Sequence, residues 1–451
     1  MKFGGTSVGT VESLRNVKRI VESADEPVIV VVSALGGITD RLIKTSEMAC
    51  EGDKAYRDEM DYIIERHRVV CDTLVDPALR QDVWRRVSAL LEELGNVYYG
   101  IELVGDVSPK VLDRIVSFGE RMSSILVSAI INGAELHYSP EFILTEKWYG
   151  KHIPDNPLTQ KLIADRFNSS DFKVIVAPGF ISSDRDSGFI TNLGRGGSDF
   201  TAAIIAAALD ADVLEIWTDV DGFMSADPRI IDDAHVLPKL SFVESMDLCS
   251  FGAKVIYPPT IYPVFQKKIP IYIKNTFNPE AEGTCISDTY CGCDRLFRGV
   301  TSIKDVDLFS LRCANRTAMS NRIFTLLSKK GVEVLMVARN ADDSSPVTFA
   351  VRHAEADRAE ELLRTEFEME LSNGELSDLH RQKDAATVSA VGENLKETPA
   401  MIDRLTNTLL RENIEVLASA AGSSGITLSV VVTAEDMNRA LRVLHDAYLG
   451  A

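Results

Sequence analysis

The feature that most constrains the fold is an alternation of short apolar runs with amphipathic segments over roughly the first 280 residues, the pattern of an α/β domain with a mainly parallel sheet. Four β-branched runs that end near Gly, Pro, Ser, Thr or Asn are expected strands: Val28–Val32, Val174–Ala177, Val213–Trp217 and Ile269–Ile273. Segments with helical periodicity and charged or capping ends are expected helices: Thr10–Ala24, Tyr56–Leu74, Gln81–Leu94 and Ser198–Leu209.

The C-terminal part of the chain repeats itself. Arg322 precedes Val332–Leu335 as Arg404 precedes Ile414–Leu417, so the two copies superpose at a shift of 404 − 322 = 82 residues. Each copy predicts a β-α-β-β-α unit with a polar Ser-Ser turn, at Ser344-Ser345 and at Ser423-Ser424. Units this small bury little core alone, so we expect them to pair within the chain or across a homodimer.

These patterns predict four segments. Residues 1–280 form the α/β domain, residues 281–298 a linker, and residues 299–385 and 386–451 the two repeated units, the second of which a strand near 299–304 would complete.

Composition favours small-molecule chemistry. A net charge of −19 repels phosphates, which argues against nucleic acid or an anionic membrane as a partner. The apolar run Val28–Val32 is too short to span a bilayer, and Met1-Lys2 leads into glycines rather than into a signal-peptide core. We therefore expect a cytoplasmic protein.

Three of the seven cysteines, Cys285, Cys291 and Cys293, lie close together in the sequence. Three thiols at such spacing are a conceivable zinc site, but no fourth ligand follows at a zinc-like spacing, and the next histidine is His353. A linker that carries reduced thiols is the preferred interpretation, and no resident metal site is expected.

A glycine-rich segment opens the chain. Lys2-Phe3-Gly4-Gly5-Thr6-Ser7 combines a cation, two glycines and two hydroxyls before an expected helix. Such a loop lets backbone N–H groups approach phosphate oxygens, although a purely structural turn is the alternative. The spacing is not that of a P-loop.

A second glycine-rich segment, Gly194-Arg195-Gly196-Gly197-Ser198-Asp199, opens a helix. Ser198 or Asp199 would serve as an ordinary helix cap. Capping does not explain an arginine between glycines, whose planar fork suits a carboxylate or phosphate.

Two further segments carry polar groups near strand or helix ends. Trp217-Thr218-Asp219-Val220-Asp221-Gly222 ends an expected strand, where open α/β sheets bind ligands, and runs into Asp227-Pro228-Arg229. A structural Asp-Gly turn is the alternative there. Phe251-Gly252-Ala253-Lys254 adds another glycine-flanked cation.

Together and in this order, these segments resemble the aspartate kinases of the amino-acid-kinase family. Val32-Ser33-Ala34 with Gly37-Ile38-Thr39, and Ser117-Phe118-Gly119-Glu120, match as well, and the C-terminal repeat resembles the family's tandem ACT domains. The resemblance covers essentially the whole chain. It implies a three-layer sandwich with a mainly parallel central sheet, of the carbamate-kinase type, followed by two ferredoxin-like α+β ACT domains.

The resemblance also implies a reaction: ATP- and Mg²⁺-dependent phosphorylation of the β-carboxylate of L-aspartate to 4-phospho-L-aspartate, the first step of lysine, threonine and methionine biosynthesis. Lys2 would hold the transferring phosphate, and Asp199 would organise the site around the phosphates and magnesium. For the substrate, Arg195 would bind the α-carboxylate and Glu120 the amino group, with Ser33, Thr39 and Ser198 completing the pocket. The residues expected to bind nucleotide are Gly4, Gly5, Thr6, Ser7, Thr218, Asp219, Met224, Arg229, Lys254 and Val255.

The chemistry agrees with this assignment on a separate point. None of the seven histidines falls in these segments, yet no general base is needed, because a carboxylate with a pKa of about 3.9 is already ionised at neutral pH. The attacking group needs positioning and charge neutralisation instead.

Three departures from the family pattern stand out. Only Met1 precedes Lys2, which shortens the first strand, and Met224 stands where the family often has tyrosine near the adenine. The turn Arg339–Asp343 replaces the usual Thr/Ser-rich turn of the first ACT unit.

Other readings remain open. A glutamate, acetylglutamate or carbamate kinase is the nearest enzyme alternative, and a catalytically silent amino-acid sensor is a different class. Some relatives carry a homoserine dehydrogenase behind the kinase, whereas this sequence ends at Ala451. On that basis lysine is favoured over threonine as the effector of the ACT-like pair.

Overall fold

A mainly parallel sheet organises the N-terminal part of the chain in the computed structural model, which describes residues 1–148, 151–168, 172–288, 296–313, 315–338, 346–397 and 400–450. Two units are present, Met1–Phe223 with Val255–Thr289, and Met224–Lys254 with Tyr290–Ala451. The expected domain boundaries stay predictions. No helix in the described parts of the chain is both long and apolar enough to cross a membrane.

The central sheet of the first unit has the order β12-β11-β9-β1-β2-β6-β3. All neighbouring strands are parallel except β11 and β12. The strands are β1 (Lys2–Phe3), β2 (Val28–Val32), β3 (Ala134–Leu136), β6 (Val174–Pro178), β9 (Leu214–Thr218), β11 (Ile271–Asn275) and β12 (Thr284–Ser287).

The short first strand pairs on both sides. Lys2 lies opposite Val31 of β2 and Ile216 of β9, and Phe3 opposite Val32 and Trp217. Two residues are sufficient because the neighbours extend beyond them, and Phe3 stacks on Trp217 with ring centroids 5.9 Å apart. The strand that the sequence left in question therefore lies inside the sheet.

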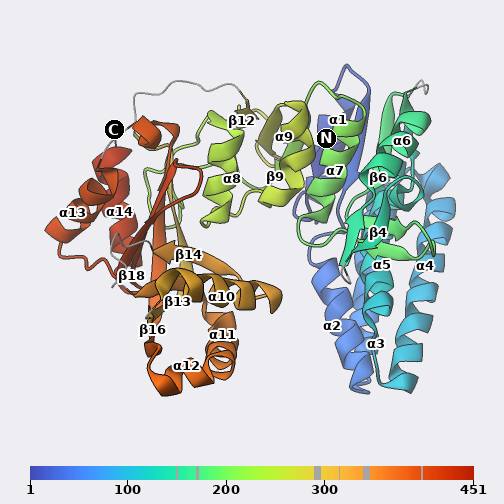
Figure 1. Cartoon of the computed structure of the whole chain (residues 1–451). Helices are drawn as coiled ribbons and strands as arrows, with labels where there is room; N and C mark the ends of the chain where they lie inside the picture. The colour runs from blue at the N-terminus through green and yellow to red at the C-terminus, as the bar shows by residue number, and fades with distance from the viewer. Residues whose placement is uncertain are drawn as a thin grey trace. The chain divides into compact units, whose positions relative to one another are not determined.

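Helices accompany this sheet: α1 (Val11–Glu22), α2 (Ile38–Cys50), α3 (Tyr56–Leu74), α4 (Pro77–Val104), α5 (Pro109–Ile130), α6 (Asn156–Phe167), α7 (Gly197–Ala208) and α9 (Tyr262–Lys267), with 3-10 turns η1 (Ser139–Glu141) and η2 (Pro258–Ile261). Helices α2 to α5 pack against one another beside the sheet (Figure 1). A smaller sheet has the order β5-β4-β7-β8, from β4 (Leu144–Trp148), β5 (Lys151–Pro154), β7 (Ile181–Asp184) and β8 (Ile190–Asn192).

Most expected elements are present, but several bounds are wrong. The helix expected over Gln81–Leu94 runs from Pro77 to Val104, because Asp76 caps its start, Gly95 and Gly100 do not interrupt it, and Gly105 ends it in a left-handed conformation. Helices α2 and α5 were not among the expected elements. Strand β12 lies within the stretch expected to be a linker, where Thr284, Cys285 and Ile286 pair with β11.

The second unit contains one antiparallel sheet of order β14-β15-β13-β16-β18-β17. Its elements are β10 (Lys239–Ser241), α8 (Phe242–Ser250), β13 (Gly299–Cys313), α10 (Arg316–Lys329), β14 (Val334–Ala338), β15 (Val347–Arg352), α11 (His353–Glu366), α12 (Glu368–Asn373), β16 (Leu376–Val391), η3 (Glu393–Glu397), α13 (Met401–Arg411), β17 (Ala418–Ala421), β18 (Thr427–Thr433) and α14 (Met437–Tyr448). From β13 onward the chain follows β-α-β-β-α twice, as the repeat predicts, with the additional short helix α12 after the first copy and the turn η3 inside the second.

The two repeated units share the long strands β13 and β16. The first part of β13, Gly299–Ile303, pairs with the end of β16, while its second part also pairs with β15. Asp305 and Asp384 adopt left-handed backbone angles, each with φ of 55°, where the strands bend. Aspartate tolerates that conformation better than most residues. The expected boundary between residues 385 and 386 falls inside β16.

Several sequence features lie outside the described residues. They are the Arg339–Asp343 turn, the Ser344-Ser345 turn, and Cys291 and Cys293. Cys285 is described and is a free, partly buried thiol.

A buried ion network crosses the first repeated unit. The Asp307 side chain is 1% exposed and accepts a hydrogen bond from Arg381 Nε at 2.6 Å, and His353 Nδ1 lies 2.9 Å from the other carboxylate oxygen. Arg381 also contacts Asp357 at 2.6 Å and Glu360 at 3.2 Å. Removing one partner of such a network leaves an uncompensated buried charge.

We predict that Asp307→Ala lowers the free energy of unfolding by about 3 kcal/mol, because Arg381 would remain buried without its best-shielded partner. The matched control is Asp357→Ala, whose side chain is 89% exposed and whose loss should leave the urea midpoint unchanged. Equal midpoints for the two variants would contradict the prediction.

Candidate active site

An open cavity of about 390 Å³ lies where β1 and β2 end in the first unit. Its lining brings together eight of the predicted site residues: Lys2, Gly5, Ser33, Thr39, Glu120, Arg195, Ser198 and Asp199. They come from segments far apart in the sequence. Lys2, Gly5 and Ser33 lie at the ends of the parallel strands β1 and β2, Thr39 and Glu120 lie on α2 and α5, and the remaining three lie at the start of α7.

The two expected catalytic residues form an ion pair. Lys2 Nζ lies 2.7 Å from Asp199 Oδ1, and the two side chains are 11% and 13% exposed. The contact is not aligned as a hydrogen bond, so Oδ1 has no hydrogen-bond partner among the described residues. The pair therefore joins β1 to the first turn of α7.

Two helices begin at the cavity without side-chain caps. Gly37 precedes α2 and Gly196 precedes α7, with φ of 79° and 71°. Both conformations suit glycine. Neither Ser198 nor Asp199 caps α7, so the capping interpretation is wrong for both. Uncapped helix N-termini present amide hydrogens and positive potential to an anion.

Arg195 lies between two glycines in left-handed conformation and is exposed. Its guanidinium lies 5.5 Å from the centre of the Tyr257 ring, a contact that orients the planar group. Ser33 Oγ donates to Ser198 Oγ at 2.9 Å, which links the end of β2 to the first turn of α7. The cation and the hydroxyls thus line the same cavity.

Glu120 is a buried acid at the cavity. One carboxylate oxygen accepts a hydrogen bond from the Ala34 amide at 3.2 Å, and the other has no partner in the described chain. Burial raises the pKa of Glu120 to about 8. The preceding Gly119 permits this position, because a Cβ there would come within 2.7 Å of Ala34 Cβ. The Gly-Glu pair therefore lets α5 approach the loop after β2.

The rest of the first glycine-rich segment behaves differently. Gly4, Thr6 and Ser7 are not among the residues that line the cavity. Ser7 is fully buried, with its hydroxyl 2.7 Å from Thr276 Oγ1 and donating to the Trp217 carbonyl at 3.2 Å. These contacts fasten the loop to β9, and a phosphate contact by Ser7 stays a prediction.

The expected nucleotide residues divide between the two units. Thr218, Asp219 and Val255 belong to the first unit, whereas Met224, Arg229 and Lys254 belong to the second. Arg229 is paired with Asp227 through Nε at 2.9 Å and Nη2 at 2.7 Å. That these six residues bind the nucleotide together stays a prediction.

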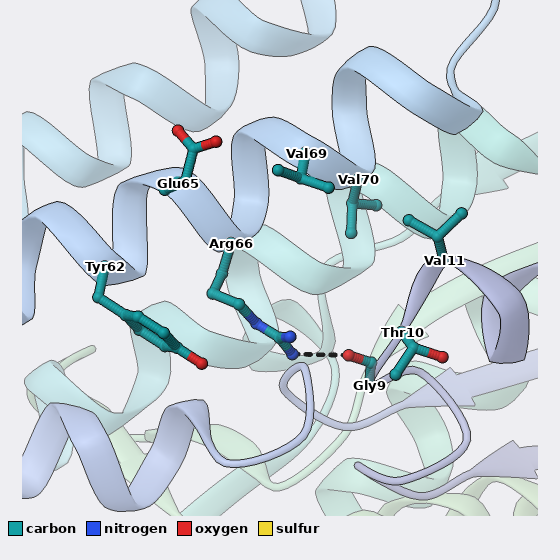
Figure 2. Close-up of a pocket in the computed structure, with 8 residues that line it drawn as sticks. All are labelled: Gly9, Thr10, Val11, Tyr62, Glu65, Arg66, Val69 and Val70. Carbon is teal, nitrogen blue, oxygen red and sulfur yellow. Dashed lines mark hydrogen bonds between the residues drawn. The ribbon is translucent and has the colours of Figure 1, made fainter.

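Arg66 is a site residue that sequence reasoning missed. It reaches from α3 to the loop before α1, where Nη2 donates to the Gly9 carbonyl at 2.6 Å, beside a small cavity of about 190 Å³ (Figure 2). The same nitrogen lies 3.5 Å from the Gly36 carbonyl. Arg66 therefore braces the loops that follow β1 and β2. No local motif marks it.

Phe180 is a second missed residue. It lines the larger cavity and has a φ of 65°, which is rare for a bulky side chain. Its amide donates to Thr201 Oγ1 at 3.0 Å, and its carbonyl accepts from the Leu193 amide at 2.8 Å. These bonds hold the strained backbone in place.

The cavity lining contains neither histidine nor cysteine. Its chemistry comes from two cations, uncapped helix amides, hydroxyls and the carboxylates of Asp40, Glu120 and Asp199. Such a set binds, orients and neutralises anionic reactants, and it suits transfer of a charged group to a nucleophile that is already ionised.

Comparisons with known proteins identify the family. The sequence model of the amino acid kinase family matches residues 1–275, and an ACT domain model matches residues 388–448. The chain is 32% identical over 461 residues to the bifunctional aspartokinase/homoserine dehydrogenase 1, chloroplastic, of Arabidopsis thaliana, covering 99% of this chain and 50% of the relative. It is 28% identical over 466 residues to aspartokinase 1, chloroplastic, of the same plant, covering 99% and 79%.

Solved structures agree. E. coli aspartokinase III in complex with aspartate and ADP (R-state) has a TM-score of 0.81 and 27% identity, covering 99% of this chain and 98% of that one. The same enzyme in complex with lysine and aspartate (T-state) has a TM-score of 0.77 at 27% identity, with the same coverage. The chain spans about half the length of the bifunctional relatives. Because the family model matches more than half of its residues, the chain belongs to the amino acid kinase family.

Proposed function

We propose that this protein is an aspartate kinase, which transfers the γ-phosphoryl group of ATP to the β-carboxylate of L-aspartate. The observation that carries the proposal is the placement of Lys2, Arg195, Glu120 and Asp199 around one cavity. Relatives and structural neighbours named as aspartokinases support it, and one neighbour was solved with aspartate and ADP.

The cavity complements aspartate group by group. An exposed arginine, Arg195, suits the α-carboxylate, because its guanidinium can donate two parallel hydrogen bonds. Glu120 suits the ammonium group, since its second oxygen is buried without a hydrogen-bond partner in the described chain. Ser33, Thr39 and Ser198 would bind the remaining polar atoms. The β-carboxylate would then face Lys2.

The reaction needs positioning more than proton transfer. The β-carboxylate is ionised at neutral pH, and Lys2 with the α7 amides would neutralise charge on the transferring phosphoryl group. Mg²⁺, when bound with ATP, supplies further charge neutralisation, and the carboxylates of Asp199 and Asp40 would hold it. Gly4, Gly5, Thr6, Ser7, Thr218, Asp219, Met224, Arg229, Lys254 and Val255 remain the proposed nucleotide contacts.

The alternatives make different predictions in one assay. An aspartate kinase forms ADP with L-aspartate, whereas a glutamate, acetylglutamate or carbamate kinase forms it with its own substrate. A catalytically silent sensor forms none. ADP formation measured with each acceptor in turn separates these readings, and absence of turnover with L-aspartate by the folded chain would overturn the proposal.

The C-terminal units are proposed to bind a regulatory amino acid and to join two chains. ACT-type sequence and the lysine-bound state of a neighbour support an effector role. Ser424 of the second polar turn and Thr427 both donate to Asp247 of α8, each at 2.5 Å. Helix α8 leads into Gly252 and Lys254, so this contact offers a route toward a proposed nucleotide segment.

The cytoplasmic location also stays a prediction, since relatives include chloroplastic proteins.

We predict that Lys2→Ala lowers kcat by roughly two orders of magnitude, because one lost electrostatic contact in the transition state costs about 3 kcal/mol. The matched control is Lys44→Ala, whose side chain is 62% exposed on α2 and should leave kcat unchanged. Near-normal turnover by folded Lys2→Ala would contradict the catalytic assignment.

We predict that Arg195→Lys raises the KM for aspartate about tenfold or more with little change for ATP, since an ammonium cannot reproduce a two-pronged carboxylate contact. Steady-state kinetics with each substrate varied would measure both constants. Equal weakening of aspartate and ATP would show instead that Arg195 faces the nucleotide.

The raised pKa of Glu120 has a consequence for stability. The folded carboxyl titrates near pH 8 and the unfolded one near 4.5, so the folded state holds the extra proton between these values. The unfolding free energy should therefore fall as pH rises through this window, by up to about 1.4 kcal/mol per unit. Bound aspartate would oppose this rise in the pKa of Glu120, because its ammonium group favours the ionised carboxylate.

We predict that Glu120→Gln flattens the decline in unfolding free energy between pH 5 and pH 8, measured by urea titration without ligand. Subtracting the two profiles cancels other titrating groups. Glu12→Gln, a change at an exposed position in the first turn of α1, is the control and should preserve the wild-type slope. A slope unchanged by Glu120→Gln would contradict the buried-acid interpretation.

We predict that lysine or threonine binds the C-terminal units and inhibits the enzyme even at saturating aspartate, and lysine is the favoured effector. The effector should bind the inhibited state about 5 to 150 times more tightly than the active state. Calorimetry with each amino acid and rates at saturating aspartate measure the two effects. Asp247→Ala should weaken inhibition while leaving uninhibited activity intact. Purely competitive inhibition, unaffected by substitutions in the repeat, would contradict the regulatory role.

A further inference from the structure

Three side chains near the end of α14 form a cluster of potential metal ligands that takes no part in the proposed kinase chemistry. Asp233, His445 and Asp446 each offer one ligand atom, and these atoms all lie within 4.8 Å of one another. The His445 side chain is 1% exposed, whereas Asp233 and Asp446 are 65% and 71% exposed. All three residues belong to the second unit.

The buried imidazole nitrogen of this cluster has no hydrogen bond. His445 Nδ1 lies 3.9 Å from Asp233 Oδ1 and 3.8 Å from Asp446 Oδ1, and among the described residues no hydrogen-bond partner contacts it. These separations exceed the usual N–H···O range of about 2.7 to 3.2 Å. A fully buried polar atom without a hydrogen bond is rare and calls for a ligand.

The other imidazole nitrogen is occupied. His445 Nε2 lies 3.0 Å from Ser225 Oγ, which accepts a hydrogen bond from the His235 amide at 3.1 Å and lies 3.3 Å from His235 Nδ1. Ser225 has one hydroxyl proton. When it donates that proton to His235, Nε2 of His445 carries a proton and donates to Ser225. Nδ1 then presents a lone pair toward two carboxylates.

A lone pair facing two carboxylates is a site for a cation. The end of α14 adds to this, because free carbonyls at a helix C-terminus carry negative potential. One imidazole and two carboxylates suit Zn²⁺ or a similar transition metal, since Mg²⁺ and Ca²⁺ prefer oxygen ligands alone. A histidine ligand whose second nitrogen donates to a neighbouring group is the usual arrangement at such centres.

We propose that Asp233, His445 and Asp446 bind a transition-metal ion of the Zn²⁺ type. Two ligand atoms on a tetrahedral ion of this type lie about 3.4 Å apart, so the exposed aspartates would rotate inward to close on it. The site is separate from the catalytic cavity and does not depend on the proposed kinase activity. It also revises the sequence-based expectation of no resident metal.

The proposed ion would fasten two segments of the second unit. Asp233 belongs to the stretch that carries Met224 and Arg229, and His445 and Asp446 belong to the C-terminal helix. Arg442 of α14 already donates to the Ile230 carbonyl at 3.1 Å, and Ile231 is buried in the same core as Leu441. A bound ion would add a link beside these contacts, so metal binding should stabilise the folded unit.

The test uses the full chain, stripped with a chelator and kept reduced, without nucleotide or aspartate. Titration with Zn²⁺ by calorimetry, and with Co²⁺ by absorption, should show one ion per chain without a thiolate charge-transfer band. Asp233→Asn and Asp446→Asn should each weaken binding at least tenfold. Asp232→Asn, a change at the exposed neighbouring aspartate outside the cluster, should bind as wild type does.

Thermal unfolding gives a second readout. Zn²⁺ should raise the unfolding midpoint of the wild type and of Asp232→Asn, but not that of Asp233→Asn. Equal binding by wild type, Asp233→Asn and Asp446→Asn would place the ion elsewhere, for example on the thiols near Cys285, and would overturn the proposal. Failure of the wild type to bind would overturn it too.

Discussion

The parallel pairing of β1 with β2 and β9 is the constraint on which the candidate site depends. It sets the ends of these strands side by side, so the loops that follow them meet at one edge of the sheet. Arg66 then ties the first two loops together through the Gly9 and Gly36 carbonyls. A Cβ on Gly36 would come within 2.9 Å of the Gly5 carbonyl oxygen, so the loops have no room for side chains between them.

The electrostatics of the site follow from that packing. Lys2 has Asp199 as an anionic neighbour at 2.7 Å, and the two are mostly shielded from solvent. The uncapped starts of α2 and α7 add positive potential from different directions. Glu120 contributes an acidic group to the same cavity. A small molecule that carries both an ammonium group and carboxylates suits this distribution, and the proposed substrate, aspartate, is such a molecule.

Sequence patterns predicted much of this but not all. Strand Val28–Val32 and helix Tyr56–Leu74 have the expected bounds, because β-branched runs and long amphipathic periods are strong local signals. Eight of the expected site residues line one cavity. Arg66 and Phe180 were missed because their roles arise from contacts with distant segments, and the metal-type cluster joins residues more than 200 positions apart for the same reason. The expected cap at Ser198 or Asp199 failed because Gly196 takes the capping position.

The shared strands of the C-terminal repeat determine how that part of the chain can be divided. Strands β13 and β16 each run through both repeated units. A cut between residues 385 and 386 would therefore sever β16 and expose unpaired strand edges on each fragment. Neither half is an autonomous building block, although the sequence repeat suggests two. The whole sheet should therefore be kept together as a single piece in domain transplantation, circular permutation or directed evolution. Gene duplication here would have produced a fused module whose halves stayed together afterwards.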